Sequence, residues 1–182
     1  MQMKLLGQDL ELKFLQPFSL KRPDGRDWTF QLSPLPLGFQ KKLRDKGITP
    51  PTPPVKISRD STGKPIRDHA GQVVTFTDLN SAEFLSDSEL YHQRVAVLAV
   101  VEALRNDSSV CFETVPPEVD GTNGLSWGDF ADAVFQELEQ AGFTPGDLLA
   151  FCDEICRISN MLDGHLREAQ ANFSSLPVNS SS

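Results

Sequence analysis

The sequence has few of the residues that staple small folds or cross membranes. Only three of its 182 residues are cysteines, at positions 111, 152 and 156, too few for a complete disulfide framework. The longest apolar run, VAVLAVV at 95–101, is far shorter than the roughly 20 residues that span a bilayer. No basic segment followed by an apolar stretch opens the chain. We therefore expect a protein of a reducing compartment, with no membrane span and no secretory signal.

The sequence also has no recognisable catalytic constellation. Its histidines are scattered at 69, 92 and 165, and no serine or cysteine stands in a nucleophile-elbow context. The GKP at 63–65 is not a phosphate-binding loop, because the preceding glycine is missing and a proline follows the lysine. Asp153 and Glu154 are adjacent, so on a helix they diverge by about 100° and cannot act as a facing acid/base pair. We predict a protein that is not an enzyme and that needs no cofactor.

Two cysteines, Cys152 and Cys156, lie four residues apart in LLAFCDEICRI, the spacing of one helix face. A structural zinc needs about four ligands that converge from one side, and Cys111 is distant in the sequence. Free cysteine is among the most buried residue types and behaves as a small hydrophobe. We interpret the pair as core, with a metal site or a reactive thiol as the less favoured alternatives.

The charge is unevenly distributed along the chain. Residues 1–72 carry 13 Lys and Arg against 7 Asp and Glu, whereas residues 73–182 carry 4 against 18. The basic residues are spread out and lack interleaved aromatics, so we expect no nucleic-acid partner. The plain interpretation is a solvated acidic helical surface beside a mildly basic sheet. The alternative is that the polarity serves head-to-tail self-association or the recognition of a basic partner.

The first half of the chain predicts a β-hairpin followed by an irregular segment. In FSLKRPDGRDWTFQL at 18–32, apolar and polar residues alternate on both sides of a Pro-Asp-Gly turn, which predicts a hairpin with one apolar face. The segment KKLRDKG at 41–47 is typical of a helical turn. The four prolines of TPPTPPV at 49–55 predict an extended linker. Short alternating runs between 55 and 77 indicate an irregular β excursion or a mobile insertion.

Beyond residue 78 the sequence predicts three helices, at about 87–105, 127–141 and 145–171. Their starts are marked by capping-box spacings at Ser86, Ser126 and Thr144, the last followed by Pro145 at the first helical position. The first helix is apolar almost all round and should be central, and the second is one-sided. We therefore predict an α+β fold, a small N-terminal antiparallel β element followed by a helical domain of three main helices. Its predicted parts are a hairpin module at 1–48, a linker and β excursion at 49–78, an acidic helical domain at 79–171 and a disordered tail at 172–182.

The apolar arc of the third helix is wider than one packed face needs. It runs from Phe151 and Ile158 on one flank to Leu149 and Cys156 on the other. One explanation is that the helix lies between two neighbours in its own domain. The other is that one flank, Phe151 with Ile158, belongs to a groove that receives a partner's helix. Leu149, on the other flank, is a further candidate partner-binding residue.

This layout resembles the tail assembly chaperones of long-tailed bacteriophages. The resemblance rests on FSLKRPDGRDWTFQLSPLPLGF at 18–39, on the helical start FTPGDLL at 143–149, and on the order of elements from 14 to 171. The proline-rich excursion at 49–77 is longer than the family's compact pattern. The family has no catalytic residues to carry over.

The resemblance implies a non-enzymatic protein of the host cytoplasm that coats the apolar helices of the tape-measure protein and recruits tail-tube subunits. It also implies self-association along a rod and, in many such families, a longer frameshifted product. The alternative is a structural virion component, a tail or baseplate adaptor, which presence in the mature particle would reveal. A host regulatory adaptor and a metal-dependent or thiol enzyme remain open as less favoured classes.

Overall fold

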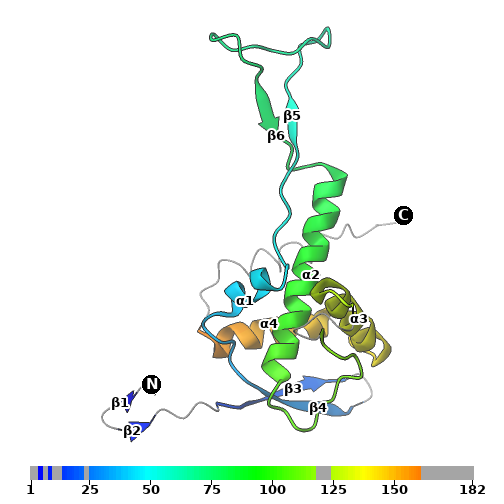
Figure 1. The fold of residues 1–182 in the computed structure, drawn as a ribbon. Coiled ribbons are helices and arrows are strands. Elements are labelled where there is room, and N and C mark those ends of the chain that lie inside the picture. Colours follow the sequence, from blue (N-terminus) through cyan, green and yellow to red (C-terminus); the bar gives the residue numbers. More distant parts are fainter. Residues whose placement is uncertain (1–3, 6–7, 10–13, 23–24, 118–123, 161–182) are drawn as a thin grey trace, which may run out of the picture. The chain divides into compact units, whose positions relative to one another are not determined.

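The computed structural model describes residues 4–5, 8–9, 14–22, 25–117 and 124–160. By packing, the chain divides into two compact units: unit 1 comprises 1–48 and 94–182, and unit 2 comprises Thr49–Gln93. The fold is α+β, as predicted, and the described residues form small antiparallel hairpins and four helices (Figure 1). Strands β1 (Lys4–Leu5) and β2 (Gln8–Asp9) form one short pair. No helix in the described ranges is both long enough and apolar enough to cross a membrane.

The predicted hairpin of unit 1 is confirmed. Strand β3 (Gln16–Lys21) pairs antiparallel with β4 (Asp27–Leu32), and Phe18 lies opposite Phe30. The turn closes through the Gly25 N–H, which donates to the Arg22 carbonyl at 3.0 Å, with Gly25 at φ 79°. Because side chains alternate between the faces of a strand, the apolar residues share one face. On that face Leu20 and Leu32 are buried.

Four helices follow: α1 (Phe39–Asp45), α2 (Ala82–Leu104), α3 (Trp127–Gln140) and α4 (Pro145–Ile158). The capping boxes predicted at Ser126 and Thr144 are confirmed, with the N–H of the aspartate three residues later donating to each hydroxyl. Helix α1 ends at Asp45, and Gly47, two residues later, has φ 78°. There the Ile48 N–H reaches back to the Leu43 carbonyl and both side chains are buried, so a helix end becomes part of the core.

Two predicted helix bounds were wrong. Helix α2 begins at Ala82 and not near 87, because the Ser81 hydroxyl accepts from the Phe84 N–H at 3.1 Å and so provides an earlier cap than Ser86. Helix α4 ends at Ile158 and does not continue to 171, since Asn160 has φ 49°, a left-handed conformation that stops a helix. The rest of that predicted helix, 161–171, and the predicted tail at 172–182 lie outside the described residues.

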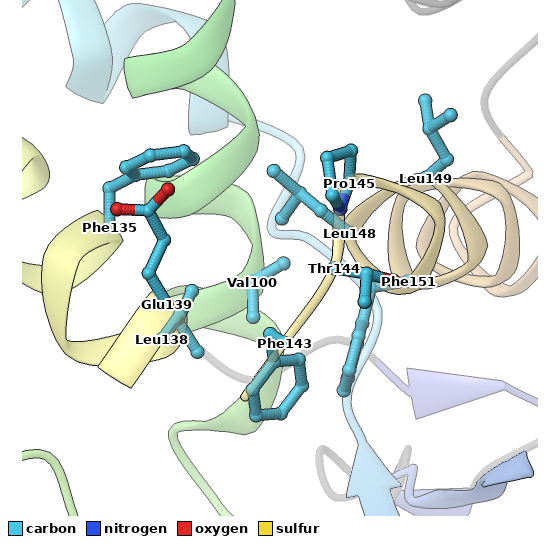
Figure 2. Close-up of a pocket in the computed structure, with 10 residues that line it drawn as sticks. All are labelled: Val100, Phe135, Leu138, Glu139, Phe143, Thr144, Pro145, Leu148, Leu149 and Phe151. Atoms are coloured by element: carbon cyan, nitrogen blue, oxygen red, sulfur yellow. The ribbon is translucent and has the colours of Figure 1, made fainter. Parts of the chain in front are cut away.

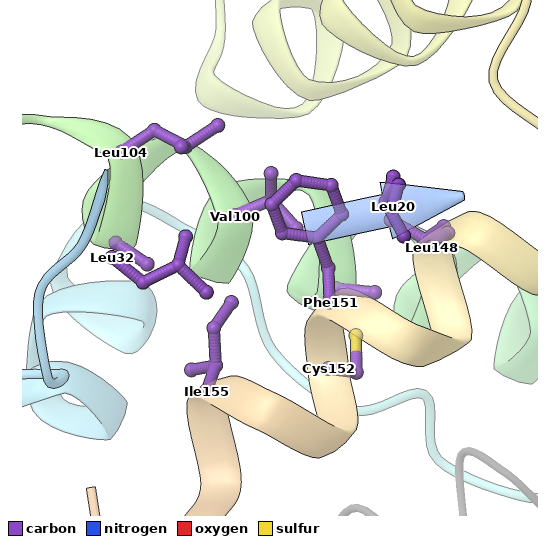
Figure 3. Packing of buried hydrophobic residues seen from close by; sticks show 10 residues of the cluster. Leu20, Leu32, Val100, Leu104, Leu148, Phe151, Cys152 and Ile155 are labelled. Atoms are coloured by element: carbon purple, nitrogen blue, oxygen red, sulfur yellow. The ribbon is translucent and has the colours of Figure 1, made fainter. Parts of the chain in front are cut away.

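The core of unit 1 lies between the hairpin, the second half of α2, and α4 (Figure 3). Its cluster consists of Leu20, Leu32, Ala96, Val100, Ala103, Leu104, Leu148, Phe151, Cys152 and Ile155. Helix α4 therefore has two neighbours, which explains its wide apolar arc. Fully burying a side chain of this size stabilises the fold by about 1.5–3 kcal/mol. The same cluster fixes the positions of the residues that form the candidate site.

Unit 2 contains a hairpin that we call the arm, residues 55–77. Strand β5 (Val55–Ile57) pairs with β6 (Thr75–Thr77), and two small loops extend from their far end (Figure 1). The predicted β excursion is thus an ordered element. An eight-residue repeat, RDSTGKPI followed by RDHAGQVV, was not among the predicted features and builds the two loops.

The repeat makes the arm a junction of three β-hairpins. The N–H of Ser58 donates to the Val74 carbonyl, that of Val74 to the Ile66 carbonyl, and that of Ile66 to the Ser58 carbonyl, each at 2.9 Å. The three residues are eight apart, so this ring of backbone hydrogen bonds has an approximate threefold pattern. It holds the loops to the β5–β6 stalk without any buried side chain at its centre.

Each loop is closed by the same side chains. In the first, the Asp60 carboxylate accepts from the N–H groups of Thr62 and Lys64 at 2.8 and 3.0 Å. In the second, Asp68 accepts in the same way from Ala70 and Gln72 at 2.9 and 2.8 Å. The arginine before each aspartate donates to a glycine carbonyl of its own loop. These contacts join residues at most four apart, so each eight-residue repeat specifies the shape of its own loop.

Candidate partner-binding surfaces

An apolar pocket of about 220 Å³ opens between α2, α3 and α4 in unit 1 (Figure 2). Helix α2 supplies one lining residue and α3 supplies three, while the α3–α4 connection and α4 supply the others. The lining residues are Val100, Phe135, Leu138, Glu139, Phe143, Thr144, Pro145, Leu148, Leu149 and Phe151. The volume suits a few apolar side chains of a partner.

The turn between α3 and α4 shapes the pocket. Helix α3 ends in a Schellman motif, in which the Phe143 N–H donates to the Leu138 carbonyl at 3.0 Å and the Gly142 N–H to the Glu139 carbonyl at 2.9 Å. Gly142 adopts φ 86°, which a residue with a Cβ rarely adopts. The motif brings Phe143 back over Leu138, so these two side chains meet on the pocket wall.

The start of α4 forms the opposite wall. Thr144 and Asp147 make reciprocal capping bonds, with the Thr144 N–H donating to the Asp147 carboxylate at 2.7 Å. Pro145 occupies the first turn, where its missing N–H costs nothing. The helix therefore begins at a defined residue, which sets the direction of Leu148 and Leu149 on the following turn.

Phe143 joins the pocket to an aromatic cluster under the hairpin. Its ring centroid lies 5.3 Å from that of Trp28 and 6.0 Å from that of Phe151. Phe151 in turn packs edge-on against Phe18 and Phe30, at 4.9 and 5.0 Å. Aromatic pairs at such separations add about 0.5–1.5 kcal/mol beyond their buried area. The inner side of the pocket is therefore rigid, since its rings are packed from behind.

Arg22 ties the hairpin to the pocket turn. Its guanidinium donates to the Asp147 carboxylate and to the Gly142 carbonyl, and lies 4.1 Å from the centroid of the Trp28 ring. Burial raises the pKa of Asp147, but the hydrogen bonds from Thr144 and Arg22 outweigh this effect and hold the pKa below its ordinary value. The carboxylate is thus charged and held by two elements at once.

The pocket has an acidic side. Glu139 is the one ionisable residue among its lining residues and is exposed to solvent. It lies in the last turn of α3, which contains no basic residue. The partial negative charge of a helix C-terminus adds to that of the carboxylate. An apolar segment flanked by Lys or Arg would therefore fit the pocket better than one flanked by Asp or Glu.

The three predicted site residues differ in how they lie relative to the pocket. Phe151 is not on an exposed flank: it is 1% exposed and reaches the pocket only as part of its inner wall. Ile158 is half-buried against the core and does not line the pocket. Leu149 is half-buried and lines it. The proposed exposed pair of Phe151 and Ile158 is therefore corrected, because the hairpin covers the Phe151 side of α4.

Most pocket residues were not predicted as site residues. Phe143 and Leu148 are recognisable in the sequence as a hydrophobic pair flanking a helix start. Gly142 five residues before Asp147 also indicates a tight turn between two helices. Nothing in the sequence signals that Phe135 and Val100 would meet them, because that depends on how α2 and α3 pack.

The cysteines support the core interpretation. Cys152 is 6% exposed, and burial raises the pKa of its thiol to about 12, so it is neutral and unreactive at physiological pH. Cys156 is half-buried and Cys111 is exposed. Within the described part of the chain, no cluster of three or more His, Cys, Asp or Glu side chains could hold a metal ion.

The arm offers a second apolar surface. Five large hydrophobic residues in it are between 36% and 66% exposed: Val55, Ile57, Ile66, Val74 and Phe76. Val55 and Ile57 share one face of the hairpin with their partners Thr77 and Thr75. A lone two-stranded hairpin is marginally stable in water, and apolar patches of this kind mark contact sites.

No protein-family model, no curated protein and no solved structure matches this chain. The class that the structure defines is an α+β protein with two apolar surfaces, one a pocket in a helical layer and one an exposed β arm. Its particular function is argued from these surfaces.

Proposed function

We propose that this chain is a non-enzymatic tail assembly chaperone of a long-tailed bacteriophage, acting in the host cytoplasm. In this role it binds apolar helical segments of the tape-measure protein and helps to recruit tail-tube subunits. The observation that carries the proposal is the apolar pocket between α2, α3 and α4. The tape-measure protein is proposed as the partner because the hairpin and the start of α4 resemble that family.

The pocket suits the recognition of a helix by its apolar face. Partners of this kind insert side chains spaced three or four residues apart into a hydrophobic groove. The rigid aromatic wall at Phe143 and Phe151 lowers the ordering cost of binding. Leu149 and Phe135, both half-buried, are accessible apolar side chains among the lining residues. A protein that shields long apolar helices needs such a surface on a folded body.

A structural virion component is the second candidate. It is favoured by one observation, the exposed apolar arm, which a permanent neighbour in a tail or baseplate would cover. The two candidate functions differ in whether the protein is present in the mature particle. A chaperone leaves before the particle is complete, whereas an adaptor is found in purified particles by mass spectrometry.

The proposal is tested by co-expressing the chain with the longest helix-rich protein encoded near it, followed by size-exclusion chromatography with light scattering. We expect a soluble complex with several copies of this chain per long protein. Leu149→Asp combined with Phe135→Ser places a charge and a hydroxyl at the pocket rim, and should weaken the complex at least about tenfold, which corresponds to 1.4 kcal/mol.

The matched control is Leu37→Asp, which introduces the same charge at a fully exposed leucine of unit 1 outside the pocket. It should leave the complex unchanged. Circular dichroism would verify that both variants are folded. Separate elution of the two wild-type proteins, with precipitation of the long one, would overturn the proposal, as would equal binding by the pocket variant and the control.

A further inference from the structure

The hydrogen-bond pattern of the arm leaves the backbone of β5 pointing outward at alternate residues. Across the β5–β6 hairpin, the Ser58 N–H donates to the Val74 carbonyl at 2.9 Å. Along an antiparallel strand, residues that bond to the partner strand alternate with residues whose N–H and C=O groups point away from it. Val55 and Ile57 lie three positions and one position before Ser58, so they belong to the second kind.

This outward-pointing series continues into the first loop of the arm. Ser58 and Asp60 both hydrogen-bond across that loop, each at 2.9 Å. Arg59 lies between them, so its N–H and C=O groups also point outward. Backbone donors and acceptors are thus presented at three alternate residues, Val55, Ile57 and Arg59, which we call the outer edge.

The side chains of the outer edge define the chemistry of a matching strand. Because its residues are two apart, their side chains share one face. Val55 and Ile57 are 66% and 46% exposed, and Arg59 is also exposed. Lys56 lies on the opposite face, where its amine pairs with the Asp78 carboxylate at 2.5 Å. The outer edge therefore presents two apolar residues followed by one cation.

The other edges of the three-hairpin junction are less suited to a further strand. The middle edge contains Pro65, which lies opposite Arg59 and has no N–H to donate. The third edge presents Thr75 and Thr77, whose side chains carry hydroxyls. Natural proteins use proline to protect edge strands from unwanted pairing. Here the middle edge is protected in this way, whereas the apolar outer edge is not.

We propose that the outer edge binds an extended segment of a partner protein as an added β-strand. That segment carries apolar residues opposite Val55 and Ile57 and a carboxylate opposite Arg59. Strand addition gains affinity from main-chain hydrogen bonds and specificity from alternate side chains. The backbone of the arm is already fixed by its ring of hydrogen bonds, so binding costs it little conformational entropy. The proposal does not rest on the function proposed above, because the partner is defined by its chemistry alone.

The first test uses the peptide acetyl-Asp-Glu-Thr-Ile-Thr-Val-amide as a probe. In an antiparallel register it places Glu opposite Arg59, Ile opposite Ile57 and Val opposite Val55. Titrated into the isotope-labelled full chain and followed by NMR, it should bind with a Kd below about 1 mM and shift the amide signals of residues 55–59.

Two methylated peptides test whether the contact is a strand pairing. A methyl group on the peptide nitrogen of Ile removes an N–H that faces the outer edge, and should weaken binding at least about tenfold. The matched control is a methyl group on the nitrogen of the following Thr, whose N–H faces away from the edge. It should weaken binding less than about twofold. This pair leaves the protein unaltered, so the folding of a variant does not affect the result.

A pair of proline variants locates the contact on the arm. Ile57→Pro removes an outward N–H from β5, and Thr75→Pro removes the outward N–H of the residue opposite it on β6. Neither N–H takes part in the ladder, a position where an edge strand tolerates proline. Slow hydrogen exchange at Ser58 and Val74 would verify that the arm is folded. Ile57→Pro should weaken peptide binding at least about tenfold, and Thr75→Pro less than about twofold.

The charge contribution should be smaller. Arg59→Gln should weaken binding about two- to fivefold, whereas Lys64→Gln, which removes a charge from the same loop outside the outer edge, should leave it unchanged. The proposal is wrong if the peptide does not bind at about 1 mM, or if the two methylated peptides or the two proline variants lose binding equally. It is also wrong if anionic lipid vesicles or nucleic acid bind through Arg59 and the peptide does not.

Discussion

Unit 1 and the arm of unit 2 are ordered by different forces. In unit 1, Leu32, Phe151 and Ile155 are at most 1% exposed and pack into one cluster. In the arm, the large hydrophobic residues are exposed and the backbone is held by hydrogen bonds between residues close in sequence. The core depends on its side-chain volumes, whereas the arm depends on its turn residues. A core of this kind confers stability, while an arm of this kind has apolar area available for a partner.

The largest difference between the two regions should appear when a phenylalanine is truncated in each. Phe151→Ala removes a fully buried ring and should lower the free energy of unfolding by about 3–5 kcal/mol. Phe76→Ala in the arm should change it by less than about 0.5 kcal/mol. Both tryptophans, Trp28 and Trp127, lie in unit 1, so their fluorescence during denaturant unfolding reports on that unit alone. Equal losses in the two variants would show that the arm contributes to the same core.

A smaller effect is expected at Arg22, which joins the hairpin to the α3–α4 turn. Arg22→Ala removes the bonds to Asp147 and Gly142 and the contact with Trp28, and should cost about 2–3 kcal/mol in denaturant unfolding. Arg157→Ala is the matched control, since that arginine pairs with Glu154 on an exposed helix surface. It should cost less than about 0.5 kcal/mol. A similar cost for both arginines would contradict the anchoring role of Arg22.

Acid should destabilise unit 1 partly through Asp107. Burial raises the pKa of this carboxyl, but hydrogen bonds from the Ser109 hydroxyl and from the N–H groups of Gln31 and Ser109 outweigh burial and hold the pKa below its ordinary value. The resulting stabilisation is present above the ordinary aspartate pKa, near 4, and is lost as the pH falls through the lower folded-state pKa. Fluorescence-monitored unfolding from pH 7 to pH 2 should therefore show a decline below about pH 4.

Asp107→Asn should lower stability by about 1–2 kcal/mol at pH 7 and should approach wild type at low pH. Asp60→Asn is the comparison in the arm: the pKa of Asp60 is also lowered, mainly by the Thr62 hydroxyl, but the residue belongs to unit 2. It should leave the pH profile of the tryptophan signal unchanged. A profile for Asp107→Asn parallel to wild type at every pH would refute this assignment.

The smallest global effect is expected from opening the arm loops. Asp60→Ala with Asp68→Ala removes the acceptors that close both loops. The tryptophan-monitored free energy of unfolding should stay within about 0.5 kcal/mol of wild type, because no core residue is touched. Hydrogen exchange at residues 58–74 should accelerate severalfold, while exchange in α2 beyond Arg94 should not change. Unchanged exchange in the loops would show that the aspartates do not organise the arm.

Several elements could be predicted because their causes are local. The hairpin follows from alternation around Pro-Asp-Gly, and the starts of α3 and α4 follow from capping residues three positions apart. The repeat in the arm was equally visible in the sequence, yet its ring of hydrogen bonds joins residues eight and sixteen apart and so depends on how three hairpins meet. The start of α2 was misjudged because Ser86 has a capping-box partner at Glu89, whereas Ser81, whose hydroxyl caps the helix, has Phe84 at that position.

The candidate site was predictable only in part. Leu149 and Phe151 line the pocket, Phe151 only as part of its inner wall, whereas Ile158 packs against the core and does not line it. A helical periodicity identifies the apolar side of α4 but does not say whether one neighbour or two cover it. The side chains that cover Phe151 on α4 are those of Phe18 and Phe30, more than 120 residues away along the chain.

The sequence by itself determined the turns, the caps of α3 and α4, and the acidic character of the helical part. All of these arise from interactions within one element or from the composition of a segment. Only the tertiary structure decided that the hairpin covers one side of α4, that α2, α3 and α4 enclose an apolar pocket, and that the apolar residues of the arm stay exposed. The physical reason is that burial depends on which distant segments come together, and packing between segments has no local signature.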